Sequence, residues 1–317
     1  MYKYRAYGLV FESDVELDEC EPIDAGVPAD VTIRYSDLQD MVDELGACEG
    51  VMSKRLSPDG EAPSRFTKNV GNAFYAYLVG ELYIKVSNWN LIEYKPLIDV
   101  ESMDFHQWML CYVMTIALIK KHEIIIHCAG LLVPGTDNAV LVCGDSGAGK
   151  STISDALLDR GMLFVSDDSV RVGLENGEAK VYGSYRQRRL CEDVVERCGY
   201  DKDLLRYFED GFKKKWALIV RDGYYGGTPH KLKYLFFLSL KEDGELEFKE
   251  VSGADKIKQI MRALYKRDVY KSEGLSTELF IKFANIAKDV KVYRIERPIN
   301  GMTVDTITDT IMKLCSE

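Results

Sequence analysis

The sequence lacks the features that mark several classes of protein. It contains 8 cysteines in 317 residues, but no two of them stand in a CxxC spacing. Scattered thiols in a chain of this length are typical of reduced intracellular proteins, whereas disulfide frameworks occur in short secreted chains. There is also no internal repeat and no low-complexity tract. With 46% hydrophobic and 29% charged residues, the composition is that of an ordinary globular protein.

Positive charge and long apolar runs are also scarce. Lys and Arg number 41 against 51 Asp and Glu, which gives a net charge of −10. Without an excess of positive charge to recruit phosphates, we expect no nucleic-acid partner and no membrane-surface partner. The apolar stretch from Trp108 to Ile119 is shorter than the ~20 residues of a membrane span. Because Met1 to Val10 has no apolar run of signal-peptide length, we expect a cytoplasmic protein.

The length of the chain and its first hundred residues predict a two-domain organisation. At about 150 residues per domain, the expected count is about two. Residues 1–100 are rich in strand-like runs, including a hairpin in which Gly80-Glu81 joins Phe74–Val79 to Leu82–Val86. We therefore expect a smaller, strand-rich amino-terminal domain over residues 1–100.

Residues 101–317 show a mixed α/β pattern. Apolar residues recur at helical spacing from Asp104 to Lys121. A buried-strand run, Ala139–Cys143, is followed by a glycine-rich loop, a helical stretch over Ser151–Arg160 and a strand at Leu163–Val165. Later segments predict strand Lys233–Leu240, helix Lys256–Tyr265, helix Thr277–Lys288, strand Val290–Ile295 and helix Thr303–Leu314. Such an order implies helices packed on a central sheet, so we expect residues 101–317 to form one α/β catalytic domain.

The glycine-rich loop matches the phosphate-binding motif G-x-x-x-x-G-K-[ST] in full. The residues expected to contact a nucleotide here are Gly144, Asp145, Ser146, Gly147, Ala148, Gly149, Lys150, Ser151 and Thr152. Glycines permit backbone angles closed to other residues, and successive N–H groups at a helix N-terminus bind phosphate. We expect Lys150 to reach the β- and γ-phosphates of ATP and the Ser151 hydroxyl to bind Mg²⁺. A chance glycine-rich turn is the alternative, but it would not account for the flanking strand and helix.

Two aspartates follow the next strand. Asp167 and Asp168 lie at its carboxyl end, where carboxylates bind Mg²⁺ or take a proton from an attacking hydroxyl. On extended backbone the two side chains point to opposite faces, so we expect one role for each. The structural alternative is that one of them only caps the following turn.

A histidine precedes the glycine loop by one hairpin. His127 ends the strand-like run Ile124–Ile126, and an imidazole there can orient a carboxylate or contact a phosphate. Its position alone equally suits a core histidine satisfied by backbone groups. The other three histidines, His106, His122 and His230, have no comparable setting, and we assign them no role.

Two basic stretches are further candidates for anion contact. Arg186, Arg188 and Arg189 stand close together, and arginine forks suit phosphate and carboxylate groups. We take Arg186 as a candidate nucleotide contact, while a solvated charge run explains the stretch equally well. For Lys213-Lys214-Lys215 the solvated run is the simpler explanation.

Three segments within residues 126–168 together resemble the HPr kinase/phosphorylase family, and most closely its smaller kinase relatives. They are Ile126-His127-Cys128-Ala129-Gly130, the glycine loop, and the run from Asp159 to Asp168. The resemblance implies a P-loop variant of the phosphoenolpyruvate carboxykinase-like fold, in which a histidine, the loop and paired aspartates line one nucleotide site. The amino-terminal hundred residues resemble the same relatives more weakly.

The resemblance also implies roles for individual residues. His127, Lys150 and Asp167 take catalytic positions, with Asp167 as the base that deprotonates a substrate hydroxyl, and Asp168 assists the metal or the nucleotide. A homo-oligomer is implied as well. The chain departs from the bifunctional members, however, because Tyr182–Leu190 stands where a Glu beside an Arg-Gly-rich segment is expected. This departure speaks against the phosphorylase reaction and against HPr as the substrate.

The leading hypothesis is therefore an ATP- and Mg²⁺-dependent kinase that phosphorylates a hydroxyl, on a serine of a protein or peptide or on a small molecule. A small-metabolite kinase of the shikimate type is an alternative, but such kinases usually start at the P-loop strand, and about 140 residues precede it here. An ABC-type ATPase would need an LSGGQ-like segment, which the sequence lacks. A regulatory protein that binds ATP without transferring phosphate is a third possibility. Its expected mark is erosion of the motif residues, all of which are intact.

Overall fold

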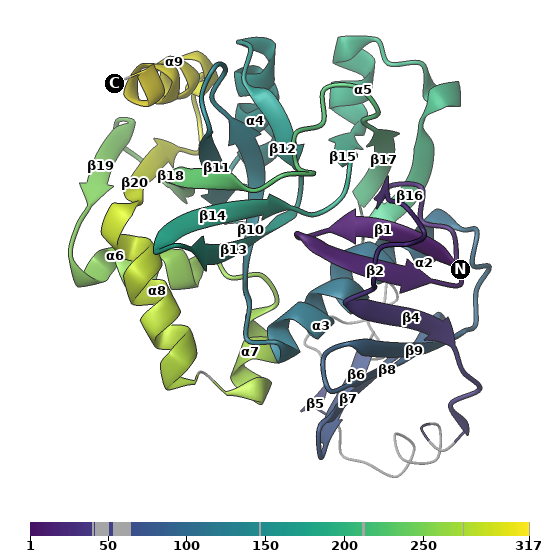
Figure 1. The fold of residues 1–317 in the computed structure, drawn as a ribbon. Helices are drawn as coiled ribbons and strands as arrows, with labels where there is room; N and C mark the ends of the chain where they lie inside the picture. The colour runs from purple at the N-terminus through teal and green to yellow at the C-terminus, as the bar shows by residue number, and fades with distance from the viewer. Residues whose placement is uncertain are drawn as a thin grey trace. The chain divides into compact units, whose positions relative to one another are not determined.

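The structure, a computed structural model, describes residues 1–39, 41, 51–52, 65–145, 147–210, 213–274 and 276–316. Packing divides the chain into two compact units (Figure 1). Unit 1 contains Met1–His122 and Gln187–Ile219, and unit 2 contains Glu123–Arg186 and Val220–Glu317. This division differs from the predicted one at residue 100, because the helical segment after residue 102 and the later segment 187–219 both pack within unit 1.

Unit 1 is built on a mixed nine-stranded sheet in the order β3-β1-β2-β4-β9-β8-β7-β6-β5. Its strands are β1 (Tyr2–Ala6), β2 (Leu9–Ser13), β3 (Glu21–Pro22), β4 (Val31–Tyr35), β5 (Val51–Met52), β6 (Arg65–Val70), β7 (Ala73–Leu78), β8 (Leu82–Ser87) and β9 (Leu91–Pro96). Burial alternates along β7 and β8, as expected for a sheet with one buried face. The predicted hairpin is confirmed as these two strands. Leu78 pairs with Leu82, so the connecting turn is one residue longer than expected, and Gly80 has a φ of +77°.

One long helical segment belongs to unit 1. It consists of α2 (Met103–Trp108), the π-helical turn η1 (Met109–Val113) and α3 (Met114–Lys120), which follow one another directly and confirm the predicted helix. Ser102 begins it by accepting a hydrogen bond from Phe105 N at 3.3 Å. Residues 109–119 are buried on every side, which is typical of a helix at the centre of a core. Among the described residues, no helix is long and apolar enough to cross a membrane.

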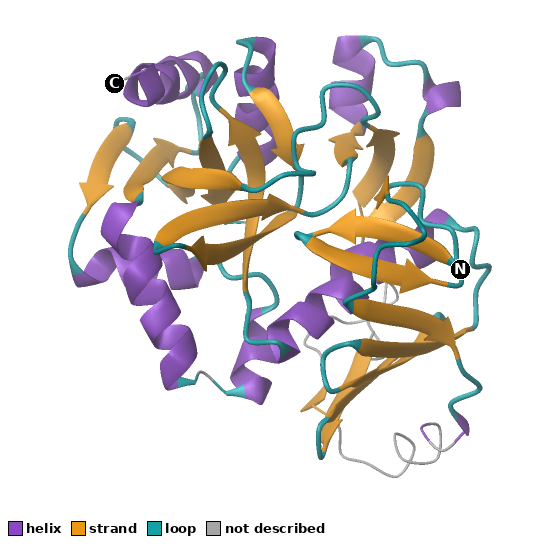
Figure 2. Ribbon diagram, viewed as in Figure 1, coloured by secondary structure: helices purple, strands orange, loops and turns teal. Residues whose placement is uncertain are grey.

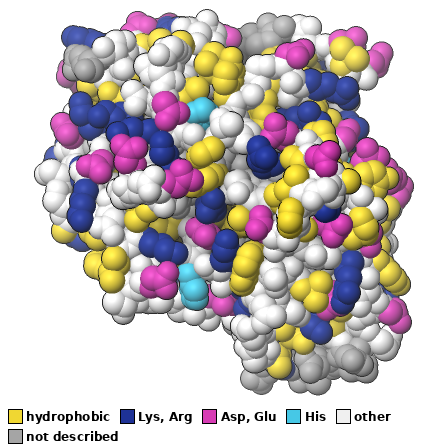
Figure 3. Space-filling model, in the orientation of Figure 1, with side chains coloured by type: hydrophobic (Ala, Val, Ile, Leu, Met, Phe, Trp, Pro, Cys, Tyr) yellow, Lys and Arg dark blue, Asp and Glu magenta, His cyan; other side chains and the backbone are white. Residues whose placement is uncertain are grey.

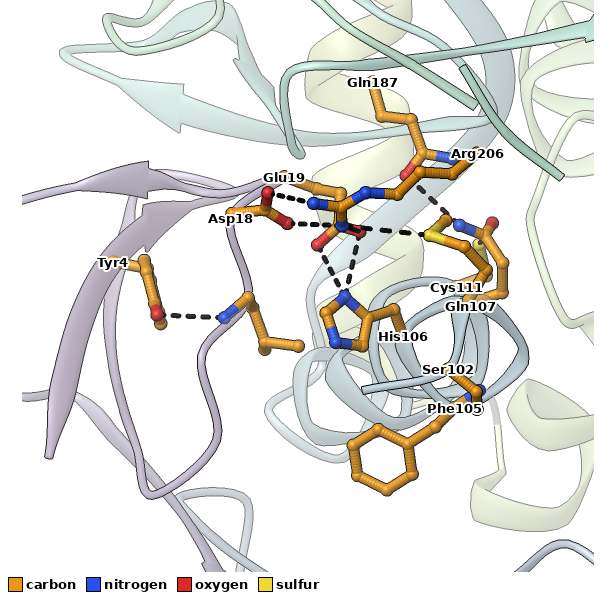
Figure 4. A network of polar contacts seen from close by, with 12 residues as sticks. Tyr4, Asp18, Glu19, Ser102, Phe105, His106, Gln107, Cys111, Gln187 and Arg206 are labelled. Atoms are coloured by element: carbon orange, nitrogen blue, oxygen red, sulfur yellow. Dashed lines mark hydrogen bonds and ion pairs between the residues drawn. The ribbon is translucent and has the colours of Figure 1, made fainter. Parts of the chain in front are cut away.

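The segment 187–219 forms a small three-stranded sheet in the order β15-β17-β16. Its elements are β15 (Gln187–Cys191), α5 (Glu192–Cys198), the 3-10 turn η2 (Lys202–Leu204), β16 (Arg206–Asp210) and β17 (Lys213–Ile219). Figure 4 shows how this segment joins the rest of unit 1: Arg206 reaches Asp18, and Gln187 accepts a hydrogen bond of 3.1 Å from Gln107 of α2. Side-chain contacts distant in sequence therefore assign the segment to unit 1.

Unit 2 contains a mixed eight-stranded sheet with the path β11-β10-β13-β14-β18-β20-β19, to which β12 is added beside β10. Its strands are β10 (Ile124–Leu132), β11 (Asn138–Gly144), β12 (Leu163–Ser166), β13 (Ser169–Glu175), β14 (Glu178–Gly183), β18 (His230–Lys241), β19 (Glu247–Val251) and β20 (Lys291–Pro298). β11 also pairs in parallel with β18, which pairs in parallel with β20. The carboxyl ends of these three strands therefore lie at one edge of the sheet.

Helices pack against this sheet (Figures 1 and 2). They are α4 (Lys150–Asp159), α6 (Ala254–Arg262), α7 (Arg267–Glu273), α8 (Thr277–Asp289) and α9 (Val304–Ser316). α4 and α9 share one core with β10, β11, β18 and β20, whose buried members include Ile153, Leu157, Phe236, Ile295, Ile307 and Ile311. α8 contacts α6, β13 and β14. The expected α/β class is confirmed at this level.

The α6–α7 connection, residues 263–266, differs from the sequence prediction. The predicted helix over 256–265 ends at Arg262, because the residues after it hydrogen-bond to β10 instead of continuing the helix. Ala263 O accepts from His127 N at 2.8 Å, and Tyr265 N donates to Ile125 O at 2.9 Å. A tertiary contact thus takes the backbone groups that the helix would have used.

Candidate active site

The glycine loop connects β11 to α4. Gly147 and Gly149 have φ angles of +80° and +94°, which favour glycine over residues with a Cβ. Gly144 needs to be glycine for another reason: a Cβ there would lie 2.9 Å from the backbone oxygen of Leu238 on β18. Ser146 lies outside the described residues. The strand, loop and helix predicted around the motif are all present, and α4 begins at Lys150.

Two arginines brace this loop from other elements of unit 2. Arg297, near the end of β20, donates from Nε to Ala148 O at 2.9 Å, and its guanidinium lies beside Gly149. Arg262, at the end of α6, places Nη2 2.6 Å from Asp145 Oδ2. Its guanidinium also lies 4.7 Å from the centre of the Phe237 ring. Cations thus gather at the loop although the chain as a whole is acidic.

Lys150 contacts His127 directly. The Lys150 Nζ lies 2.6 Å from His127 Nε2, and His127 Nδ1 lies 2.8 Å from the backbone oxygen of Asp168. A carbonyl oxygen only accepts hydrogen bonds and an ammonium only donates them. The imidazole is therefore neutral in this arrangement, with its proton on Nδ1 and its Nε2 lone pair directed at Lys150.

His127 does not end its strand, as the sequence suggested, but lies in the middle of β10. This strand changes partner along its length. Residues 124–127 pair with β13, whereas residues 130–132 pair with β12. The bend between β12 and β13 therefore passes alongside His127, and that bend holds Asp167 and Asp168. The antiparallel register is what brings the predicted histidine and aspartates together.

Asp168 also differs from the prediction of two alternating side chains on extended backbone. Its φ is +79°, and its N–H donates to Asp167 Oδ1 at 3.0 Å. Its carboxylate is 8% exposed, with Oδ1 3.6 Å from His127 Nδ1 and Oδ2 accepting a 2.9 Å hydrogen bond from the Tyr265 hydroxyl. Asp167 is half-buried. The two carboxylates therefore have distinct surroundings because the backbone bends tightly at Asp168, and not because their side chains alternate along an extended strand.

The remaining motif residues lie in the first turn of α4. Ser151 and Thr152 are half-buried there, and the backbone oxygen of Ser151 accepts a 2.8 Å hydrogen bond from Ser154 Oγ. The strand, the described loop residues and the helix start thus follow one another in the order that the motif predicts, and nucleotide contact by these residues stays a prediction.

The basic stretch is divided between the two units. Arg186 lies at the end of the first segment of unit 2, where its backbone oxygen accepts from Val220 N at 2.7 Å. Its role in nucleotide binding stays a prediction. Arg188 and Arg189 belong to unit 1, where Arg188 donates to the Tyr200 hydroxyl at 3.2 Å. Arg189 lies 5.4 Å from the centre of the Phe208 ring. Among the three lysines, the described Lys215 contacts Cys191 Sγ at 2.9 Å.

A second histidine–carboxylate cluster lies within unit 1 (Figure 4). His106 Nδ1 is 2.9 Å from Glu19 Oε1, and these side chains are 4% and 0% exposed. Arg206 contacts both oxygens of Asp18, at 2.8 and 2.6 Å, and lies 3.6 Å from Glu19. Three side chains of this cluster have the chemistry of metal ligands, but the Arg206 guanidinium supplies the positive charge that the two carboxylates require. The cluster is an ion-pair network.

The pKa of His106 follows from these contacts. Burial disfavours the charged ring and lowers the pKa, but the hydrogen bond and the negative charge of Glu19, with Asp18 beyond it, outweigh burial. The pKa of His106 is therefore raised above its usual 6.5. No local pattern in the sequence singles out this residue, because its partners are far away along the chain.

Arg262, Tyr265 and Arg297 are site residues that the sequence prediction missed. Arg297 had a usable signal: it lies near the carboxyl end of a strand, where ligands bind in open α/β sheets. Tyr265 had none, since it was assigned to a helix. Figure 3 shows basic and acidic side chains intermixed on the face in view, so neither sign of charge covers that face alone.

No family model matches the chain, and no curated protein matches it. Among solved structures, the chain is similar to an Hpr(Ser) kinase/phosphatase from Coxiella burnetii, with 16% sequence identity and a TM-score of 0.29. The match covers 61% of this chain and 93% of the other.

Proposed function

We propose that this chain is an ATP-dependent kinase that transfers the γ-phosphate to a hydroxyl group. The observation that carries this proposal is the 2.6 Å contact between Lys150 Nζ and His127 Nε2, beside the bend that holds Asp167 and Asp168. A phosphate-binding motif, a basic side chain and carboxylates at one place are the parts that phosphoryl transfer needs. The finer assignment, a phosphoenolpyruvate carboxykinase-like kinase related to HPr kinases, belongs to the same proposal.

The residues present suit Mg·ATP as the substrate. The positive φ of Gly147 and Gly149 lets backbone N–H groups face a phosphate without side chains in the way. Ser151 and Asp168 offer hydroxyl and carboxylate oxygens, the donors that Mg²⁺ prefers. When bound, Mg²⁺ neutralises charge on the phosphate oxygens.

Lys150 would change partner when the triphosphate enters. In this structure its ammonium donates to a neutral imidazole, which is a weaker acceptor than an anionic phosphate oxygen. We propose that Lys150 transfers its hydrogen bond from His127 to the β- and γ-phosphates and there stabilises the negative charge of the transferred group. The neutral imidazole then remains oriented by Asp168 O.

Asp167 would act as the base in this proposal. Its carboxylate lies on the same bend as Asp168 but is less enclosed, which leaves it more accessible to an incoming hydroxyl. We propose that it takes the proton of the acceptor hydroxyl as that oxygen attacks the γ-phosphorus, while the bond from the γ-phosphorus to the bridging oxygen breaks and ADP leaves. The acceptor class proposed is a serine hydroxyl of a protein or peptide, or the hydroxyl of a small molecule.

The experiment compares Asp167→Asn with wild type in two assays: transfer from γ-labelled ATP to HPr, free serine and serine-containing peptides, and equilibrium binding of Mg·ATP. We expect transfer to fall by about 10³-fold, with the dissociation constant changed less than about twofold, since a base acts on the acceptor. Asp159→Asn, exposed at the far end of α4, is the matched control.

Two results would contradict the proposal. Undiminished transfer by Asp167→Asn would remove Asp167 from the role of base. Tight ATP binding by wild type with no labelled acceptor in any of the three classes would favour a regulatory ATP-binding protein.

A further inference from the structure

We infer that Tyr265 is a positioning residue of this site: it holds the Asp168 carboxylate and the His127 ring in the orientation that directs Nε2 at Lys150. The inference rests on the proposed function and deepens it. The sequence offers no motif at this position, and the residue enters the site only because the α6–α7 connection runs beside β10.

Tyr265 makes two contacts with the centre. Its hydroxyl donates to Asp168 Oδ2 at 2.9 Å, and its ring stacks on His127 with centroids 5.2 Å apart and planes 14° apart. The first contact fixes the direction of the carboxylate, and the second fixes the plane of the imidazole. One side chain therefore holds both His127, which contacts Lys150, and Asp168, which contacts His127.

Backbone contacts with β10 fix the position of Tyr265. Its N–H donates to Ile125 O at 2.9 Å, and Leu264 forms a bridge with Ile126. The residue before the histidine and the residue before the tyrosine thus lie side by side, which fixes the spacing of the two rings. Side chains carried by hydrogen-bonded backbone hold functional groups more tightly than side chains on an open loop.

The role of the hydroxyl follows from the competition for His127 Nδ1. That nitrogen is 2.8 Å from Asp168 O and 3.6 Å from Asp168 Oδ1. If the carboxylate turned towards the ring, Oδ1 would replace the backbone oxygen as the partner of Nδ1, and the ring would turn away from its contact with Lys150. The Tyr265 hydroxyl holds Oδ2 and so leaves Nδ1 facing the backbone oxygen, with Nε2 directed at Lys150.

The experiment measures the state of the His127 ring by nitrogen-15 NMR of histidine-labelled protein, without nucleotide and at one fixed pH. The chain has 4 histidines, and His127→Gln assigns the signal. We expect wild type to give one sharp pair of nitrogen signals for the His127 ring, because the ring is held in one orientation. Tyr265→Phe, which keeps the stacked ring but releases Asp168 Oδ2, should shift or broaden these signals, while Tyr265→Leu should change them further.

Tyr270→Phe is the matched control. Tyr270 also contacts the start of β10. Its hydroxyl donates to Glu123 O and accepts from Ile125 N, and is therefore directed at the backbone and not at the carboxylate of Asp168. This variant should leave the His127 signal unchanged. In phosphoryl transfer, Tyr265→Phe should lower kcat by about tenfold and change the KM for ATP less than about twofold.

The outcomes separate the inference from the proposed function. Wild-type nitrogen shifts of His127 in Tyr265→Phe would overturn the inference whether or not the protein is a kinase. The same holds if Tyr270→Phe changes those shifts as much. A wild-type protein that transfers no phosphate contradicts the proposed function alone, since the NMR comparison needs no turnover.

Discussion

His106 in unit 1 and His127 in unit 2 each lie beside a carboxylate, yet their surroundings differ. His106 and Glu19 are 4% and 0% exposed, and Arg206 closes the cluster. His127 is 35% exposed, and its other nitrogen contacts a lysine of a phosphate-binding motif. A buried ion pair of this kind contributes to the stability of the fold, whereas a neutral, partly exposed histidine can exchange its hydrogen-bond partner. Access to solvent, more than the pair of residue types, therefore separates a histidine closed into an ion-pair cluster from one that a ligand can contact.

The largest expected effect comes from a substitution that breaks the buried cluster of Glu19, His106 and Arg206. Glu19→Ala leaves His106 and Arg206 without their buried counter-charge, so unit 1 should lose about 3 kcal/mol of unfolding free energy. The 3 tryptophans, at positions 89, 108 and 216, all lie in unit 1, so their fluorescence during urea unfolding reports this unit. Mg·ATP binding in the absence of urea should be retained.

Asp37→Ala is the control for this prediction. Asp37 pairs with Lys95 at 2.7 Å, but its side chain is 70% exposed, so its loss should cost less than about 1 kcal/mol. If the two variants are equally stable, the cluster around Glu19 contributes no more than a surface ion pair.

The next largest effect concerns the candidate active site of unit 2. Arg297→Ala removes the guanidinium that braces Ala148 and lies beside Gly149, and we expect phosphoryl transfer to fall by about 10²-fold. The unfolding free energy of unit 1, followed by tryptophan fluorescence, should not change. Arg294→Ala, three residues earlier on β20 and paired with Glu296 at 3.2 Å, should keep near-normal transfer. Equal losses of phosphoryl transfer in both variants would mean that transfer depends on the positive charge of β20 and not on the contact between Arg297 and the glycine loop.

The smallest effect is the pH dependence of unit 1. The folded-state pKa of His106 is raised, so the stabilisation from its charged form is fully present below the unfolded pKa near 6.5. It is lost as the pH rises through the folded pKa. The unfolding free energy from tryptophan fluorescence should therefore decline from pH 6 upward, and His106→Gln should flatten this decline. A decline of the same size in the variant would assign it to other groups.

Local patterns predicted much of the secondary structure correctly. The hairpin at β7 and β8 and the helix after residue 102 follow from period-2 and helical spacing of apolar residues. The glycine loop follows from a motif whose residues are contiguous. These features depend on residues close together in the chain, which is why the sequence sufficed.

Other features depended on pairing between distant segments. The helix predicted to run to Tyr265 ends at Arg262 because β10 takes the following backbone groups. Asp168 leaves the extended conformation because β12 and β13 pair with the same strand. Segment 187–219 joins unit 1 through contacts of Arg206 and Gln187. No local pattern carries such information.

The sequence by itself determined the α/β class of unit 2 and the identity of the groups available for chemistry: Lys150, His127 and the two aspartates. The tertiary structure decided which of them touch, which face solvent, and which further residues join them. The reason is physical. Backbone propensity and side-chain periodicity act over one turn or one strand, whereas distances, burial and proton positions at a site are set by the register of strands and by segments that meet only in the folded chain.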